Sequence, residues 1–149
     1  MASIETVDFS VLKVEQTNVS DIVGMGGKNE KNDVLLIQTL IKLAGFSEFF
    51  SKKRFGLKIK DLPEPTGVFD IRTSQAILGF QRRMANRLLG IDGKVHPGNY
   101  KNRVLKKGFT GRVMAITLLN LEALDGALIN FDGDVISAVK KIVPSIVFV

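Results

Sequence analysis

Residues 66–81 read TGVFDIRTSQAILGFQ and join a glycine turn to a segment with helical periodicity. Gly67 can adopt the positive φ that a tight turn needs, and Asp70 is a favourable helix N-cap. The apolar residues that follow recur every three or four positions and mark one buried face: Ala76, Ile77, Phe80 and Met84. The stretch therefore predicts a turn followed by a helix that runs to about Leu88.

Residues 92–99 read DGKVHPGN and repeat the same turn pattern, with Gly93 as the turn glycine. Val95 holds the position that Phe69 has in the first copy. Because apolar residues at such positions normally enter the core, we expect Phe69 and Val95 to share one hydrophobic centre. Pro97 is favoured in the first turn of a helix, so this copy predicts a third, shorter helix.

A helix is also predicted upstream of both turns, with Asn32 or Asp33 as its cap and Gly45 at its end. Its apolar face is formed by Val34, Ile37, Ile41 and Ala44. Gln38 lies inside this face, and Gln81 lies inside the face of the following helix. Because a buried amide usually completes a set of hydrogen bonds, we expect each glutamine to hold a neighbouring turn.

Three other segments of the N-terminal two thirds have weaker patterns. Residues 1–21 mix apolar and polar positions and predict a strand or an extended lead-in. Residues 24–29 (GMGGKN) lack the residues of a phosphate-binding loop and predict a connecting turn. Residues 47–65 contain two prolines and a basic patch, which predicts a long irregular excursion over the surface.

The C-terminal extension, residues 106–149, is interpreted from its pattern alone. Residues 112–121 fit either a strand or a buried helix, because periodicity does not separate the two. A short helix over residues 135–142 has two candidate caps, Asp132 and Asp134. The apolar tail, residues 145–149, predicts a strand that packs on the core or contacts a partner protein.

Length and composition restrict the chemistry. A chain of 149 residues with 45% apolar residues predicts one domain with a core of its own. Cysteine is absent and His96 is the single histidine, so thiolate sites, zinc sites and catalytic triads have too few parts. We therefore expect a binding protein that is not an enzyme and uses no metal or cofactor.

The charge of the chain favours an anionic partner. The formal net charge is +6, and residues 80–112 hold nine Lys or Arg against one acid. Nucleic acid, anionic lipid, teichoic acid and wall carboxylates all fit such a field. Nucleic acid is disfavoured, because the chain has no Trp and one Tyr for stacking.

Targeting and membrane signals are weak. The first residues carry no basic start followed by an apolar run, so no secretory signal peptide is visible, and the location stays open. The most apolar region, residues 113–131, is interrupted by Asn120, Glu122 and Asp125, which argues against a membrane span. We expect a soluble protein, with delivery to the cell envelope by another route as one possibility.

Over about residues 22–105, the chain resembles the peptidoglycan-binding domain family. The resemblance is carried, in order, by the helical segment around Gln38, the turn at Gly67, Phe80-Gln81 and Asp92-Gly93. That family is a compact three-helix module that recognises bacterial cell wall and commonly accompanies wall-cleaving enzymes. The resemblance implies a mainly α fold with a three-helix core. The segment before the first helix, residues 23–29 followed by Asp33-Val34, looks like that of stand-alone members found beside contact-dependent secretion loci.

The chain departs from the family pattern at its turns and in one loop. Thr66 replaces the usual Asp, Asp70 and His96 replace glycines, and Asn99 replaces a Thr. The loop between the first two helices is also longer than usual. Asp and Asn cap helices well, so the expected fold survives, while the shape of a ligand groove would change.

We expect a ligand groove beside the second helix and a separate set of structural residues. Arginine presents a planar fork to carboxylates, helix-start amides supply donors, and a tyrosine ring can lie against a sugar. The candidate ligand-binding residues are Arg72, Thr73, Gln75, Arg82, Arg83, Asn86 and Tyr100. The candidate structural residues are Gln38, Gly67, Phe69, Phe80, Gln81 and Gly93.

The expected function is non-catalytic binding of peptidoglycan through this basic groove. The main alternative is a structural or interaction subunit of a secretion apparatus or phage particle, which would reuse the module and hold a protein through the apolar C-terminus. A nucleic-acid binder rests on charge alone. A glycosidase would need a defined pair among Glu64, Asp70 and Asp92, and their spacing fixes no separation.

Overall fold

The computed structural model describes residues 1–10, 12–101, 103–105 and 112–149, so Lys106 and Lys107 of the basic stretch lie outside the described residues. The helices are α1 (Lys31–Ala44), α2 (Glu48–Phe55), α3 (Ile71–Arg83), α4 (Ala115–Phe131) and α5 (Val135–Ile142). Short 3₁₀ turns are η1 (Ile59–Asp61) and η2 (Ala85–Arg87). Strands β1 (Ser3–Asp8) and β2 (Lys13–Asn18) pair antiparallel, as do β3 (Val23–Gly24) and β4 (Lys94–Val95). The described chain is therefore mixed α/β, and the expectation of a mainly α fold is correct only in part.

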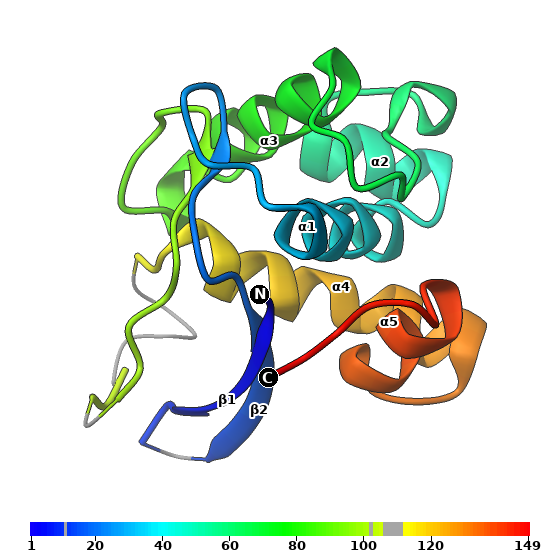
Figure 1. Cartoon of the computed structure of the whole chain (residues 1–149). Coiled ribbons are helices and arrows are strands. Elements are labelled where there is room, and N and C mark those ends of the chain that lie inside the picture. Colours follow the sequence, from blue (N-terminus) through cyan, green and yellow to red (C-terminus); the bar gives the residue numbers. More distant parts are fainter. Residues whose placement is uncertain (11, 102, 106–111) are drawn as a thin grey trace.

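The central element is α1, which lies between α2 and α3 on one side and α4 on the other (Figure 1). Because neighbours cover it on both sides, α1 is buried from Asp33 to Ala44 except at Lys42. One hydrophobic cluster joins the N-terminal segment, the middle of the chain and the C-terminal helices, with members such as Ala2, Val19, Leu36, Phe80, Val95, Leu118 and Val139. Phe69 packs against the same cluster, as expected for the paired turns. The described residues of the N-terminal segment (1–21), the middle of the chain (22–105) and the C-terminal extension (106–149) therefore share one main hydrophobic core.

The contact between α1 and α4 depends on a glycine. Gly126 lies so close to α1 that a Cβ placed on it would be 2.0 Å from the carbonyl oxygen of Leu43. This distance is far inside van der Waals contact, and the obstacle is backbone that cannot rotate away. The helix α4 therefore packs directly against the central helix α1.

Replacing Gly126 with alanine should destabilise the protein by about 2 kcal/mol, because the overpacking cost exceeds the helix-propensity gain of alanine. Gly133→Ala is the matched control, since a Cβ there meets nothing closer than 3.6 Å. Urea denaturation followed by circular dichroism measures both free energies of unfolding. Equal stabilities for the two variants would contradict the close approach of α4 to α1.

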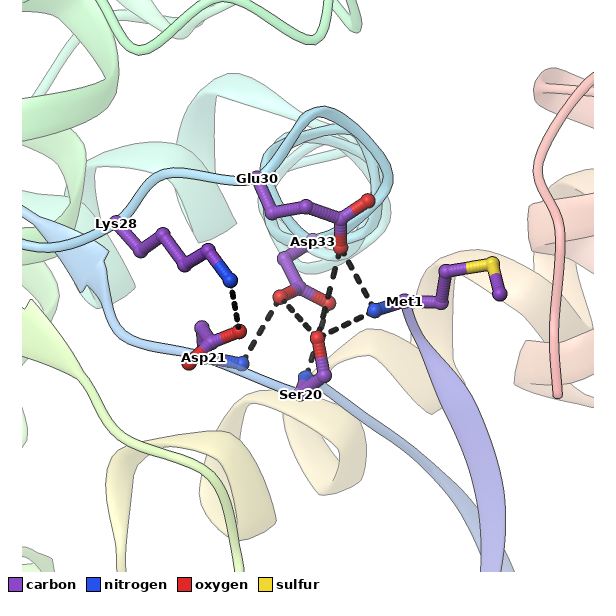
Figure 2. Close-up of polar contacts among 6 residues, drawn as sticks. All are labelled: Met1, Ser20, Asp21, Lys28, Glu30 and Asp33. Atoms are coloured by element: carbon purple, nitrogen blue, oxygen red, sulfur yellow. Dashed lines mark hydrogen bonds and ion pairs between the residues drawn. The ribbon is translucent and has the colours of Figure 1, made fainter.

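A buried carboxylate ties the N-terminal segment to the first turn of α1 (Figure 2). Asp33 accepts hydrogen bonds from the backbone N–H groups of Ser20 and Asp21 at 3.0 Å, and from the Ser20 hydroxyl at 2.8 Å. The amino group of Met1 lies 2.9 Å from Glu30 and lowers the pKa of that carboxyl group by hydrogen bonding. The predicted cap at Asn32 or Asp33 is wrong, because Glu30 is the N-cap and makes no side-chain cap bond. The carboxylate of Asp33 holds the incoming chain instead.

The predicted helix after Pro97 is also wrong. Lys94 and Val95 form a strand with β3, and the described residues that follow contain no helix before α4. The side chain of Asn18 donates to the Gly98 carbonyl oxygen and accepts from the Gly98 N–H, both at 2.9 Å. The N-terminal hairpin therefore holds Gly98 through both of its backbone polar groups, and the described residues supply no third helix at this point of the predicted core.

The predicted irregular loop over residues 47–65 is interrupted by α2 and η1. Ser47 caps α2 by accepting from the Phe50 N–H, and Gly56 ends the helix at φ 69°. The buried residues of α2 include Ser51 and Arg54 as well as Phe55, so its inward face is not an apolar stripe. The absence of that stripe explains why periodicity did not reveal the helix.

Several local predictions are confirmed. Gly45 ends α1, Asp70 caps α3, and Asp134 caps α5 by accepting from the Ser137 N–H. The helix α3 stops at Arg83 and passes into η2, so it is shorter than predicted. Residues 112–121 enter a buried helix rather than a strand. The apolar tail packs on the core, and Phe148 forms a parallel bridge with Ala2.

Candidate functional site

The first glycine turn is held by the amide of Gln38. Its Oε1 accepts from the backbone N–H groups of Thr66 and Gly67, each at 2.9 Å, and its Nε2 donates to the Val68 carbonyl oxygen at 2.9 Å. Gly67 adopts φ 81°, which favours glycine because it has no Cβ. The expected structural role of Gln38 and Gly67 is therefore present in the contacts.

The second turn repeats this arrangement around Gln81. Its Oε1 accepts from the N–H groups of Gly93 at 2.7 Å and Asp92 at 3.2 Å, and its Nε2 donates to the Lys94 carbonyl oxygen at 2.8 Å. Gly93 has φ 73°. Asp92 replaces Thr66 in this copy, and in both copies that side chain accepts from the backbone N–H two residues later. The two copies differ in sequence but share one hydrogen-bonding pattern.

Thr73 belongs to the first turn and does not face a ligand groove. It is fully buried, and its hydroxyl accepts from Gln38 at 3.0 Å while donating to Asp70 at 2.6 Å. The same Asp70 oxygen caps α3 by accepting from the Thr73 N–H. The prediction that Thr73 binds ligand is wrong, because both of its polar functions are used inside the fold.

Three of the predicted ligand residues meet at a pocket between α2 and α3. Gln75, Arg82 and Arg83 line a cavity of about 390 Å³. Its apolar surface comes from Phe55, Leu57 and Leu78. Gln75 and both arginines are exposed, and neither arginine forms an ion pair with another of the described residues. We refer to this cavity as the α2–α3 pocket.

The shape of the α2–α3 pocket depends on two glycines. Gly79 lets α3 approach α2, because a Cβ there would lie 2.2 Å from the carbonyl oxygen of Phe55. A Cβ on Gly56 would lie 2.9 Å from Nε of Arg83, so the guanidinium group of Arg83 occupies the space above Gly56. Arg83 is therefore placed at the C-terminal end of α2, where a cation is favoured.

The remaining predicted ligand residues do not line this pocket. Arg72 is exposed and donates to the carbonyl oxygen of Lys60 at 2.7 Å, which fixes it over η1. Asn86 is exposed on η2, after the end of α3. Arg72 therefore lies in the first turn of α3, and Asn86 lies beyond the last residue of that helix.

Tyr100 is the clearest disagreement with the predicted groove. Its side chain is buried with Val7 and Phe9 in a second, small cluster, and its hydroxyl lies 2.6 Å from Oγ1 of Thr117. Burial raises the pKa of Tyr100 from its ordinary value of 10.0 to about 12. The helix predicted to begin at Pro97 would have included Tyr100. That helix is absent from the described residues, and the ring of Tyr100 packs against Val7 and Phe9 of the N-terminal hairpin.

The lone histidine is paired with a carboxylate. Nε2 of His96 lies 2.7 Å from Oδ2 of Asp92, and both side chains are partly exposed. This interaction contributes to holding the pKa of Asp92 below its usual value, against the opposing effect of burial. Among the described residues, no group of three His, Cys, Asp or Glu side chains could hold a metal ion.

The pocket residues that sequence reasoning missed are Leu78 and Gly79 on α3 and, at the end of α2, Phe55, Gly56 and Leu57. Phe55, Gly56 and Leu57 lie in a stretch predicted as an irregular loop. The sequence signal for the helix that carries them is found in its two capping residues. Ser47 followed by Glu48 fits a helix start, and Gly56 fits a helix end in the left-handed conformation. A search for caps rather than apolar stripes would have found α2 and the wall it supplies.

Comparison with family models, curated proteins and solved structures finds no match for this chain. Within the part of the chain that the structure describes, no single helix is long and apolar enough to cross a membrane.

Proposed function

We propose that this protein is a non-catalytic module that binds bacterial cell-wall peptidoglycan through the α2–α3 pocket. The observation that carries the proposal is the meeting of Gln75, Arg82 and Arg83 at one cavity with an apolar floor. These residues are separated along α3 but share its outward face. The turns at Gly67 and Gly93 support the proposal through the resemblance of their sequence pattern.

The chemistry of the pocket suits the peptide stems of the wall polymer. Stem peptides carry carboxylates, and a guanidinium group can donate two parallel hydrogen bonds to one carboxylate. The amide of Gln75 can both donate to and accept from a peptide group. Phe55, Leu57 and Leu78 offer apolar surface to short aliphatic side chains in the same cavity. A stem peptide would therefore be bound both by the charge of the arginines and by the apolar surface of the pocket.

Exposed arginines make the binding sensitive to salt. Charges in contact with solvent are screened over about 10 Å at 0.1 M ionic strength. We therefore expect retention on the wall at low ionic strength and progressive release as salt is added.

Co-sedimentation with purified sacculi tests the proposal. Arg82→Gln combined with Arg83→Gln should lower the retained fraction about tenfold or more at low salt, since charge-assisted hydrogen bonds to carboxylates are lost. Lys140→Gln with Lys141→Gln is the matched control, because it removes two adjacent exposed cations from α5. Equal retention of both double variants, or no retention of the wild type at low salt, would reject the proposal.

A second candidate is a structural or interaction subunit of a secretion apparatus or phage particle. The observation that favours it is an exposed apolar face on α4, formed by Leu124, Leu128 and Ile129. The tail itself is occupied within the fold, since the Val149 N–H donates to the Ala2 carbonyl oxygen. A protein complex that is lost in Leu128→Lys, together with no affinity for sacculi, would favour this candidate over the first.

A further inference from the structure

A second pocket, of about 220 Å³, lies between the start of α4 and a preceding segment that contributes Asn99, Tyr100, Arg103 and Leu105. It shares no lining residue with the α2–α3 pocket. Its walls are mostly apolar, from Leu89, Leu105, Val113 and Met114. We refer to this cavity as the Tyr100 pocket, because Tyr100 is one of its lining residues.

Among the described residues that line this cavity, two cations, two hydroxyl groups and the side chain of Asn99 are polar. The guanidinium groups belong to Arg103 and Arg112, both exposed. Neither of them forms an ion pair with any residue in the described ranges. The buried hydroxyl groups of Tyr100 and Thr117 form a hydrogen bond with each other, with 2.6 Å between their oxygen atoms. The pocket therefore combines apolar walls with two cations that no described carboxylate pairs with.

We propose that the Tyr100 pocket binds a small monocarboxylate that has an apolar body. The two guanidinium groups would receive the carboxylate, and the apolar walls would cover the rest of the molecule. A dry cavity of about 150 Å³ holds a benzene molecule, so a volume of about 220 Å³ accommodates one ring with its carboxylate. A fully hydrophilic anion such as acetate would leave the apolar walls unfilled.

The chain carries its own reporter for this site. Tyr100 is the single tyrosine and there is no tryptophan, so tyrosine emission reports on this pocket alone. Cyclohexanecarboxylate is a suitable probe, because it is transparent where tyrosine is excited. We expect a saturable change in the emission of the full chain on titration with this acid.

Two comparisons separate the contributions of charge and apolar body. Cyclohexanecarboxamide has the same ring without the charge and should bind about tenfold or more weakly, and acetate should bind weakly for the opposite reason. Arg103→Gln with Arg112→Gln should reduce the affinity for the acid to that of the amide. Lys140→Gln with Lys141→Gln should leave it unchanged, since those lysines lie on α5.

Three outcomes would overturn the inference. They are a non-saturable emission change, equal affinity for the acid and its amide, and full binding by the Arg103 and Arg112 double variant. Far-ultraviolet circular dichroism of that variant checks that it folds, and exposed arginines on loops should not alter the fold. The result is independent of the proposed wall binding, because sacculi retention tests Arg82 and Arg83 while the emission titration tests Arg103 and Arg112.

Discussion

Replacing Gln38 with methionine is expected to destabilise the protein by about 3 kcal/mol, since several polar groups lose a partner at once. Methionine keeps the length and volume of the side chain but neither donates nor accepts as the amide does. The N–H of Gly67 is buried, so water cannot replace the lost Oε1. Chemical denaturation with two-state analysis gives the free energy of unfolding.

Gln81→Met is the internal comparison for this prediction. Its partners Asp92, Gly93 and Lys94 are exposed or half-buried, so water can take over part of the bonding. We expect a loss of about 1–2 kcal/mol there, smaller than at Gln38. A larger loss at Gln81 than at Gln38, or no loss at either, would show that the glutamines do not hold the turns.

Replacing Arg54 with methionine is expected to cost about 3 kcal/mol, because the arginine joins three helices in the interior. Its side chain is 6% exposed and donates to the carbonyl oxygens of Ala44 at 2.9 Å and Glu122 at 3.1 Å. Its Nε lies 2.7 Å from the Glu122 carboxylate, and Nη2 lies 2.5 Å from that of Asp125. The guanidinium group also lies over the ring of Phe50, at 4.3 Å from the centroid.

The matched variant for this position removes the carboxylates as well. Arg54→Met combined with Glu122→Gln and Asp125→Asn leaves no unpaired charge, so it should recover about 1 kcal/mol or more relative to Arg54→Met alone. Asp125 is 48% exposed and contributes less to this recovery than Glu122, which is 20% exposed. Thermal and urea denaturation of the wild type, the single variant and the triple variant give the comparison. A triple variant less stable than the single one would contradict the view that unpaired charge causes the loss.

The sequence predicts the parts of this fold that are decided locally. Asp70 and Asp134 cap their helices because an N-cap carboxylate needs only the N–H groups two or three residues ahead. Gly67 and Gly93 have positive φ because the turns around them require it. Gln38 and Gln81 could be assigned a structural role because an amide inside an apolar face needs partners.

The predictions that failed are those that depend on distant residues. Pro97 begins no helix in the described part of the chain, and the segment after it is held by Asn18, far away in sequence, which binds the backbone of Gly98. Tyr100 is buried because the β1–β2 hairpin supplies Val7 and Phe9 around it. The sequence around Pro97 and Tyr100 contains no sign of these partners.

In the candidate site, too, the polar residues decided by local sequence were predicted, and the wall that depends on a distant segment was not. Gln75, Arg82 and Arg83 were predicted as ligand residues from the outward face of one helix, and they do line one pocket. The opposite wall comes from α2, whose buried face contains Ser51 and Arg54 and so lacks an apolar pattern. Helical periodicity can place residues on a face, but the element that packs beside that face is a tertiary property.

An amide-shift titration of the labelled protein with soluble peptidoglycan fragments tests the central claim most directly. We expect the largest shifts at Gly56 and Leu57 and along α3 from Gln75 to Arg83, with loss of those shifts in the Arg82 and Arg83 double variant. No shifts at millimolar fragment, or shifts gathered on Leu124, Leu128 and Ile129 instead, would contradict wall binding at the α2–α3 pocket.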